Sequence, residues 1–316
     1  MSVHGNFTIS LDFELYWGMR DVQTLESYQE HISNVHFVVP KLLELFVRYE
    51  IHATWAIVGF LFYNNKEDLL KKIPSELPTY TNKRFDPYEY IKGADLEKQY
   101  HFAPGCVELI AKSAHQEIAT HTFSHYYTLE DGQTYQQFKK DLESAISAQL
   151  SMGQECQSIV FPRNQFDSEH LKIIKSLGIN FYRGNPQYWL YKPRRFQKEH
   201  LWFRLIRLAD AYINISGHNT FTVGGLVDSG PINVSASRFL RPYTPKLRKF
   251  ENLRFQRIQR SMVYAAKNNK NYHLWWHPHN FGKNLEENLL FLERILKLFQ
   301  SLNIQFGFSS KAMGEY

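Results

Sequence analysis

The sequence predicts an α/β fold built on a parallel sheet, and two observations support this prediction. Short apolar segments alternate with amphipathic helical stretches along most of the chain, which is the pattern of successive βα units. Most of the apolar segments lack a regular polar alternation, as expected of strands that are buried on both faces. A length of 316 residues suits one α/β barrel. We therefore expect a single domain over residues 1–316.

The individual elements follow from the spacing of apolar residues. Residues 7–13 (FTISLDF) alternate at period two and predict the first strand. Further strands are predicted over residues 52–58, 117–122, 158–161, 179–182, 272–276 and 304–308. Helical spacing predicts helices over residues 35–49, 107–115, 135–150, 168–177, 253–267 and 284–302. Gly178 follows one of these helices, as is typical of a left-handed helix stop.

Two long stretches interrupt this rhythm. Residues from about 60 to 105 are rich in Lys, Tyr and Pro, and residues from about 214 to 245 contain scattered Gly and Pro. Insertions of this length are usually functional or contain small elements of their own. Because the loops after barrel strands face the active site, we expect both insertions to form walls or lids over a site.

Composition and charge restrict the class of protein. The net charge of +6, from 37 Lys and Arg against 31 Asp and Glu, permits an anionic ligand. No nucleic-acid recognition motif is present, so we expect no nucleic-acid partner. The sequence does not indicate an oligomeric state. The cysteines Cys106 and Cys156 are too few for a disulfide framework and are expected to be unpaired.

The sequence does not predict a secretory leader or a membrane span. Residues 1–18 place His4, Asp12 and Glu14 inside the apolar pattern, unlike the apolar core of a secretory signal. Every apolar run is too short to cross a bilayer. A cytoplasmic location without a transmembrane segment is therefore the simplest expectation.

Three polar clusters stand at the ends of predicted strands. Asp12 and Glu14 are separated by one residue, so both lie on one side of an extended chain and can enter one site. One can bind a metal while the other handles a proton. His121 and His125 are four residues apart, the spacing that places two imidazoles on one face of a helical turn and on one divalent metal. Each cluster alone is also compatible with an exposed acidic pair or structural histidines.

The third cluster is the end of the strand at residues 272–276. His277 follows this strand and precedes a proline, and a histidine beside a metal pair is a candidate general acid. Arg163 follows the strand at residues 158–161 and adds a fixed cation, or else pairs with a surface carboxylate. The candidates for substrate contact flank these clusters and are Tyr126, Asn164, Trp276 and His279.

Taken together, these motifs resemble the polysaccharide deacetylase family, which includes the nodulation-type chitooligosaccharide deacetylases. The resemblance rests on the acidic strand end, HTFSH at 121–125, Pro-Arg at 162–163 and the strand ending in His277. The segment ATWAIVG at 53–59 also resembles the second strand of that family. The resemblance implies a distorted (β/α)7 TIM-like barrel whose site lies at the C-terminal ends of the strands.

The resemblance also implies residue roles. Asp12 matches the catalytic base, His121 and His125 match the metal ligands, and His277 resembles the general acid. Arg163 resembles the arginine that orients the base. Most members have adjacent aspartates, and Phe13 stands here in the place of the metal-binding one. We therefore assign the third metal ligand to Glu14, with Zn²⁺ as the expected ion and Co²⁺, Mn²⁺ or Ni²⁺ as alternatives.

The implied activity is removal of an acyl group, most simply acetyl, from an N-acylated sugar, within bacterial surface-polysaccharide biosynthesis. A basic stretch can bind the phosphate of a nucleotide- or lipid-linked sugar or form a solvated helix face. It comprises Arg238, Arg241, Lys246, Arg248, Lys249, Arg254, Arg257 and Arg260.

Two alternatives stay open at this point. Phe13 in the usual place of the metal aspartate favours an amidohydrolase that opens a cyclic amide or ureide, with or without a metal. A barrel that binds a glycan without catalysis is the second alternative. The presence together of Asp12, Glu14, His121 and His277 speaks against this second alternative.

Overall fold

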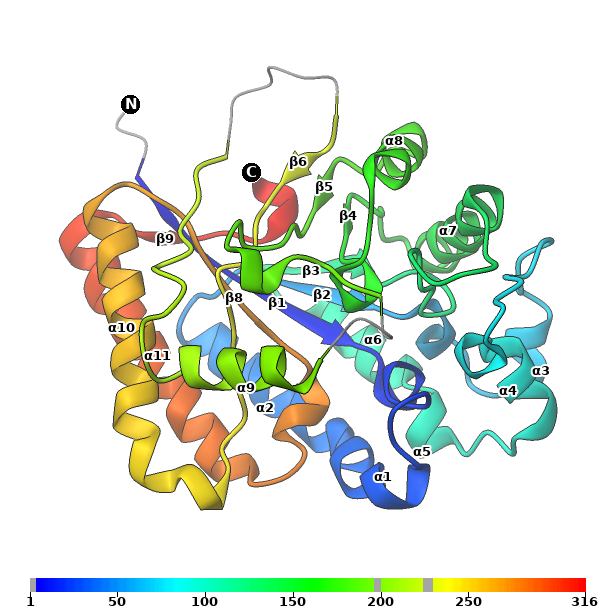
Figure 1. Ribbon diagram of the computed structural model, residues 1–316, viewed down its shortest axis with the longest axis horizontal. Helices are drawn as coiled ribbons and strands as arrows, with labels where there is room; N and C mark the ends of the chain where they lie inside the picture. The colour runs from blue at the N-terminus through cyan, green and yellow to red at the C-terminus, as the bar shows by residue number, and fades with distance from the viewer. Residues whose placement is uncertain (1–3, 196–199, 224–229) are drawn as a thin grey trace.

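The structure is a computed structural model, and it is described over residues 4–195, 200–223 and 230–316. Figure 1 shows a curled sheet flanked by helices. The strands are β1 (Asn6–Phe13), β2 (Ala53–Ile57), β3 (Gln116–Thr120), β4 (Ser158–Ile159), β5 (Phe181–Tyr182), β6 (Ile232–Asn233), β7 (Arg238–Phe239), β8 (Tyr272–Trp276) and β9 (Ser309–Ser310). The helices are α1 (Leu25–Ser33), α2 (Val35–Arg48), α3 (Lys66–Leu70), α4 (Pro87–Gly93), α5 (Lys98–His101), α6 (Pro104–Lys112), α7 (Tyr135–Leu150), α8 (Ser168–Ser176), α9 (Leu201–Asp210), α10 (Glu251–Lys267) and α11 (Leu285–Phe306).

All the strands belong to one parallel sheet. Their order across the described residues is β6-β5-β4-β3-β2-β1-β8-β7, with β9 also paired to β1. The longest strand, β1, lies in the middle, with Ile9 opposite Ala53 of β2 and Leu274 of β8. The carboxyl ends of β1, β2, β3 and β8 therefore meet on one side of the sheet. The predicted parallel α/β architecture is confirmed.

A short chain segment links the two ends of the curled sheet. The Val234 amide donates to the carbonyl of Tyr182 in β5, while the Ser237 amide donates to the carbonyl of His273 in β8 (2.9 and 2.8 Å). Residues 234–237 thus bridge the β5 side and the β8 side of the sheet. This curled half-barrel is consistent with the expected (β/α)7 barrel, although the described residues form nine strands, several of them only two residues long.

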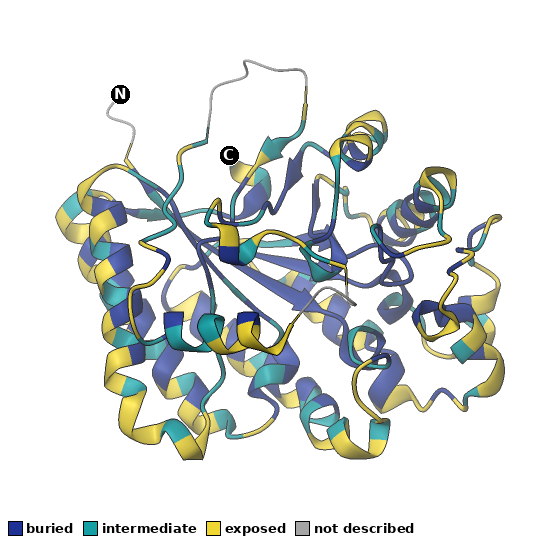
Figure 2. Ribbon diagram, in the orientation of Figure 1, coloured by how far each residue is buried: buried dark blue, intermediate teal, exposed yellow. Residues whose placement is uncertain are grey.

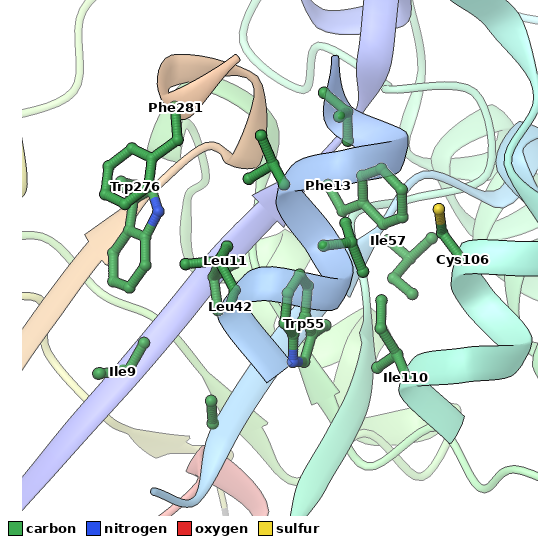
Figure 3. Close-up of a cluster of buried hydrophobic side chains, with 14 of the residues drawn as sticks. Ile9, Leu11, Phe13, Leu42, Trp55, Ile57, Cys106, Ile110, Trp276 and Phe281 are labelled. Atoms are coloured by element: carbon green, nitrogen blue, oxygen red, sulfur yellow. The ribbon is translucent and has the colours of Figure 1, made fainter. Parts of the chain in front are cut away.

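The main core lies between the sheet and its outer helices. Leu11, Phe13 and Trp55 extend from the strands toward α2 and α6 (Figure 3), and the helices bury their sheet-facing sides while exposing the others (Figure 2). Helix α11 packs against α10 and α2, and α2 also packs against α6. The resulting layer holds the strands rigidly, so that side chains at their ends are fixed.

The boundaries of several helices follow from their local sequence. A reciprocal pair of hydrogen bonds between Thr134 and Gln137 begins α7. Gly178 follows α8 with a left-handed φ of +85°, as predicted. The predicted strand at 304–308 is wrong, because α11 continues to Phe306 and ends at Gly307 in the left-handed conformation (φ +66°). The last strand is the short β9.

The first insertion contains several short helices and the second contains two short strands. Residues 60–105 include α3, α4 and α5, while residues 214–245 include β6 and β7; residues 224–229 of this stretch lie outside the described residues. Both cysteines are unpaired, as expected. Within the described residues, no helix has the length and apolar character needed to traverse a bilayer.

Candidate metal and acid–base site

The candidate site lies where strands β1, β3, β5 and β8 end. Asp12 is the second-last residue of β1, and Glu14 directly follows that strand. Both side chains therefore project from the same side, while Phe13 points into the core. His121 follows β3, Arg183 follows β5, and His277 follows β8. Strand alternation therefore separates the carboxylates from Phe13, as predicted from the D-x-E spacing.

Glu14, His121 and His125 form a compact cluster of buried donor atoms. The Nε2 atoms of His125 and His121 lie 2.9 and 3.3 Å from Oε2 of Glu14. One ligand atom from each of the three residues lies within 4.8 Å of the others. Burial lowers the pKa of His125, although Glu14 opposes this. A neutral imidazole is the form that binds a metal.

The two histidines converge through a loop rather than through the predicted helical turn. Thr122 and His125 both have left-handed φ values, +62° and +57°. The Thr122 hydroxyl accepts a 2.7 Å hydrogen bond from the Tyr126 amide and closes the loop. Nδ1 of His121 donates to the Val160 carbonyl at 2.8 Å, which leaves its Nε2 directed at Glu14.

Asp141 of α7 supports this histidine loop from behind. Its buried carboxylate accepts hydrogen bonds from the Phe123 amide (2.7 Å), the Ser124 amide (3.2 Å) and the Ser124 hydroxyl. Burial raises the pKa of Asp141 to about 7, and these three hydrogen bonds oppose that rise. The loop bearing both histidines is thus tied to a helix of the scaffold, a link that the sequence analysis did not find.

Gly18 explains how the longer side chain of Glu14 is accommodated. A Cβ at position 18 would lie 2.1 Å from Cδ of Glu14, far inside van der Waals contact. Residues 15–18 form a single 3-10 turn that returns the chain over the carboxylate. The absence of a side chain at Gly18 therefore creates the space that Glu14 occupies.

Asp12 is paired with Arg183 rather than with Arg163. Nη1 and Nη2 of Arg183 donate to the two carboxylate oxygens of Asp12 at 2.6 and 2.8 Å, and both side chains are buried. Burial alone would raise the pKa of Asp12, but Arg183, with smaller contributions from His121 and His277, holds it below its usual value. Asp12 is therefore ionised in the folded protein.

The resemblance to the deacetylase family implied this orienting role for Arg163, and the structure corrects it. Arg163 adopts a left-handed φ of +55° and forms ion pairs with the buried Asp21 and with Glu130. Its guanidinium also lies 4.2 Å from the centre of the Tyr127 ring. The signal for Arg183 was present in the sequence, because an arginine followed by glycine stands directly after the strand that ends at Tyr182.

His277 lies beside both carboxylates. Its Nε2 is 3.8 Å from Oδ2 of Asp12 and 3.6 Å from Oε1 of Glu14. Nδ1 lies 3.2 Å from Oδ1 of Asn280, which can accept a hydrogen bond from it and so direct Nε2 into the site. The His277 side chain is 23% exposed, whereas His121 and His125 are 1% and 3% exposed. Of these three, His277 alone retains clear access to the adjoining cavity.

The four predicted substrate-contact residues have different positions. Asn164 lines the cavity beside the site and accepts a 2.9 Å hydrogen bond from Arg183. Tyr126 is 1% exposed and its hydroxyl bonds to Gln133. Its expected role in substrate contact is therefore not supported by its position.

Trp276 and His279 are also buried. Trp276 packs in the core against Phe281 and is fully covered (Figure 3). His279 stacks under His277 with ring centres 4.9 Å apart, and burial lowers its pKa to about 3. Trp275 lines the cavity instead, because alternating side chains place it on the same side of the chain as His277.

A cavity of about 870 Å³ adjoins the site. Its wall includes His277, Trp275 and Asn164 from the site, together with Arg84 of the first insertion and Arg238 of the second. Both insertions thus contribute to the wall, as expected. This volume is large enough for a ligand bigger than a single acyl group.

The basic stretch divides into three groups. Arg238 and Arg241 line the cavity. Arg254 and Arg257 are buried, with Arg254 paired to Glu251 and Arg257 paired to Asp210. The remaining members are exposed to solvent and are Lys246, Arg248, Lys249 and Arg260.

The donor set suits a divalent metal. Two imidazoles and one carboxylate are the three protein ligands of many catalytic zinc sites, which keep a position open for water or substrate. The Nδ1 proton of His121 is held by a backbone carbonyl, the usual support of a ligating histidine. The residues present therefore fit the metal that the D-x-E and H-x-x-x-H spacings predicted.

Comparisons with known proteins bear on the family of part of the chain. The family model of the polysaccharide deacetylases matches residues 30–182. The match contains the histidine loop, whereas Asp12, Glu14, Arg183 and His277 lie outside it. No curated protein matches the sequence significantly.

Solved structures share the fold at low sequence identity. A protein from Mycobacterium smegmatis described as a polysaccharide deacetylase has a TM-score of 0.54 and 11% identity over 98% of this chain and 94% of its own. A GH57-type branching enzyme from Pyrococcus horikoshii has a TM-score of 0.55 and 10% identity over 98% of this chain and 69% of its own. Puue allantoinase has a TM-score of 0.51 and 11% identity over 94% of this chain and 83% of its own.

These structural likenesses show the fold alone, so the assignment depends on the family match and on the site. Residues 30–182, somewhat less than half of the chain, match the model of the polysaccharide deacetylase family, and this match indicates a deacetylase-like hydrolase.

Proposed function

We propose that this chain is a metal-dependent hydrolase that removes an acyl group, most simply acetyl, from the nitrogen of an N-acylated sugar. The observation that carries the proposal is the placement of Asp12, paired with Arg183, and of His277 beside the buried Glu14–His121–His125 cluster. The expected role in surface-polysaccharide biosynthesis and the cytoplasmic location stay predictions.

Glu14, His121 and His125 would hold the metal. When bound, such an ion polarises the acyl carbonyl and lowers the pKa of water toward 7. Zn²⁺ suits a donor set of two imidazoles and a carboxylate, and Co²⁺, Mn²⁺ and Ni²⁺ are alternatives. His277, together with His121 and His125, holds the pKa of Glu14 well below its usual value against the effect of burial, so Glu14 is available as an anionic ligand.

Asp12 acts as the general base in this proposal. Its carboxylate is ionised and held in one orientation by the two hydrogen bonds from Arg183. It can therefore accept a proton from the attacking water without first losing one of its own. The buried pair also excludes a second orientation of the carboxylate, so the accepting oxygen stays next to the metal cluster.

His277 acts as the general acid. Asn280 fixes the ring through Nδ1, so a proton carried on Nε2 faces the carboxylates and the cavity. That proton passes to the nitrogen of the sugar as the acyl carbon–nitrogen bond breaks, so that the amine leaves in neutral form. A proton-transfer residue of this kind contributes about 10²–10⁴ in rate.

Metal content and acetate release together test the proposal. After chelation and reloading with Zn²⁺, Co²⁺, Mn²⁺ or Ni²⁺, we expect about one divalent ion per wild-type chain. The reloaded protein should release acetate from N-acetylhexosamine glycosides. The double variant His121→Ala, His125→Ala should lose both the ion and the acetate release. Asp12→Asn should keep the ion and lose about 10²–10⁴ of turnover.

His170→Ala is the matched control. His170 is a buried histidine of α8 that bonds to Asp167, outside the metal cluster, so its removal should leave metal content and turnover in place. Wild-type acetate release that survives complete chelation would refute the metal-dependent step. Absence of acetate release with every added metal would refute the deacetylase assignment itself.

A further inference from the structure

The cavity beside the site is lined by an excess of positive charge. Its wall contains seven arginines and one lysine, and no aspartate or glutamate appears in the wall among the described residues. Two of these arginines are neutralised by acids outside the wall, Arg163 by Asp21 and Arg238 by Asp210. A neutral sugar would not require such a wall, whereas an anionic group would be attracted to it.

Arg204 and Arg241 carry the strongest part of this argument. Throughout the described parts of the chain, neither guanidinium takes part in an ion pair or hydrogen bond. Arg241 is half-buried and Arg204 is exposed. Burial lowers the pKa of the Arg241 guanidinium; Tyr191 and Tyr212 oppose this, and repulsion from Arg204 and Arg238 adds to it. A half-buried cation beside a second cation is stabilised when an anion binds between them.

The positive region lies within reach of the site. His277, Trp275 and Asn164 belong to the same wall as Arg204 and Arg241. His277 is also the residue that lies beside Asp12 and Glu14. A substrate whose acylated nitrogen approaches the metal cluster can therefore extend an attached anionic group toward these arginines.

Helix α9 has a second unusual feature, on its outward side. Arg204 and Arg207 line the cavity, and Phe203 is buried. Leu201 and Leu205, four residues apart and so on one face, are 67% and 57% exposed. The helix runs across the front of the molecule in Figure 1, and Figure 2 shows its exposed segments.

This apolar face continues beyond the helix. Trp202 is 47% exposed, and its ring lies 6.2 Å from that of Trp189, which is 44% exposed. Exposed leucine and tryptophan on one side of a helix, with arginines on another, is the pattern of a helix that lies in a membrane interface. The ten residues of α9 are too few to cross a bilayer.

We propose that the substrate is an acylated sugar joined through a phosphate to a membrane lipid, an inference that rests on the proposed deacylation. Arg204 and Arg241 bind the phosphate, and Leu201, Trp202 and Leu205 lie among the lipid headgroups. One helix thus joins the two functions, because its arginines face the cavity while its apolar side faces outward. A nucleotide carrier would account for the arginines but not for the outward leucines.

Vesicle binding tests the membrane contact independently of turnover. The full chain is sedimented with vesicles of phosphatidylcholine alone or with phosphatidylglycerol added. We expect binding to the anionic vesicles, reduced about tenfold or more by Leu201→Gln with Leu205→Gln. The matched control is Leu290→Gln with Ile304→Gln, two residues of α11 that are 63% and 85% exposed, which should bind as the wild type does.

Substrate selectivity tests the phosphate contact. The substrates are a short polyprenyl-phosphate-linked N-acetylhexosamine, an N-acetylhexosamine 1-phosphate, a nucleoside-diphosphate N-acetylhexosamine and a neutral methyl glycoside. We expect the lipid-linked substrate to have the highest kcat/KM. Arg241→Gln should reduce the ratio of kcat/KM for the lipid-linked over the neutral substrate by about 10–100-fold, the loss of one charge-assisted hydrogen bond. Arg260→Gln, an exposed member of the basic stretch outside the cavity, should leave the ratio unchanged.

The outcomes separate this inference from the proposed function. Equal kcat/KM for neutral and phosphate-bearing substrates would overturn the phosphate site while leaving the deacylation intact. Preference for the nucleotide-linked substrate, or equal sedimentation of the α9 variant and the wild type, would overturn the lipid carrier. If no substrate released acetate, the proposed function would fail, and the vesicle experiment would still decide whether α9 binds membranes.

Discussion

Replacement of Arg183 tests the correction that the structure makes to the sequence interpretation. Arg183→Gln removes the guanidinium from a pair in which Asp12 is 3% exposed and Arg183 is fully buried. The charged form of Asp12 then loses its strongest support, although His121 and His277 remain nearby. Removing one partner of a buried ion pair typically costs about 3–5 kcal/mol of stability.

The sign of the pH effect follows from the same pair. In the wild type, the pKa of Asp12 is below its usual value, so the base is ionised throughout the neutral range. Such a depressed pKa contributes stability above the unfolded pKa and loses it as pH falls through the folded one. In Arg183→Gln, no guanidinium opposes the effect of burial on Asp12, so the pKa of Asp12 rises. The acid limb of the kcat/KM profile should therefore move to higher pH.

The assay is the pH dependence of kcat/KM for acetate release, measured beside chemical unfolding. At the acid end, Arg183→Gln should lose up to about 10²–10⁴ of activity, the contribution of a general base, and should recover part of it as pH rises. Arg183→Lys keeps a charge but not the two-point contact, so its acid limb should fall between those of the wild type and Arg183→Gln.

A matched control separates catalysis from stability. Arg254 is another buried arginine, paired with Glu251 and lying 3.6 Å from the centre of the Phe291 ring. It also donates to the backbone carbonyl of Arg241 in the cavity wall, but these partners are separate from Asp12 and Arg183. Arg254→Gln should lower the free energy of unfolding and leave the pH profile in place. If Arg183→Gln kept an unchanged acid limb while folding normally, the assignment of Arg183 to the base would be refuted.

Three further predictions concern the supports of the site. Gly18→Ala should displace Glu14 and weaken metal binding by about 10–100-fold in a competition titration, whereas Gly93→Ala, where a Cβ meets no atom within 4 Å, should bind normally; equal affinities would show that Gly18 does not shape the cluster. Asp141→Ala leaves the Phe123 and Ser124 amides without their acceptor, so it should lower the free energy of unfolding by about 1–3 kcal/mol per unsatisfied group and weaken metal binding. An unchanged free energy of unfolding and an unchanged metal affinity would contradict the role of Asp141 in supporting the histidine loop. Trp276→Ala should cost about 3–5 kcal/mol of stability, as expected for a buried tryptophan, while Trp275→Ala should raise KM with a smaller loss of stability; the reverse result would show that the wrong tryptophan lines the cavity.

The sequence was sufficient for features that depend on local periodicity. Asp12 and Glu14 share one side of a strand because side chains alternate. The ends of β1, β3 and β8 meet because the strands are parallel. These two rules alone bring Glu14 and the two histidines together, even though the histidine loop is not helical.

Features that depend on distant contacts could not be predicted in the same way. Arg163 and Arg183 each follow a strand, and periodicity does not distinguish which of them reaches Asp12. That choice depends on the backbone at Arg163, whose left-handed conformation directs its side chain to Asp21 and Glu130. The space for Glu14 depends likewise on a turn that returns Gly18 over the carboxylate. Trp275 is different, because strand alternation with His277 already indicated it.

The charges of the two halves of the site provide a final argument about the substrate. On the metal side, Arg183 compensates the charge of Asp12, and a divalent ion held by Glu14, His121 and His125 would compensate the second carboxylate. On the cavity side, Arg204 and Arg241 have no acidic partner among the residues that the structure describes. Arg241 is half-buried beside the exposed Arg204, and an anion bound between them would relieve the repulsion of these like charges, in line with the proposed phosphate contact. The bound anion would then complete the cavity in the same way that Arg183 completes the carboxylate pair.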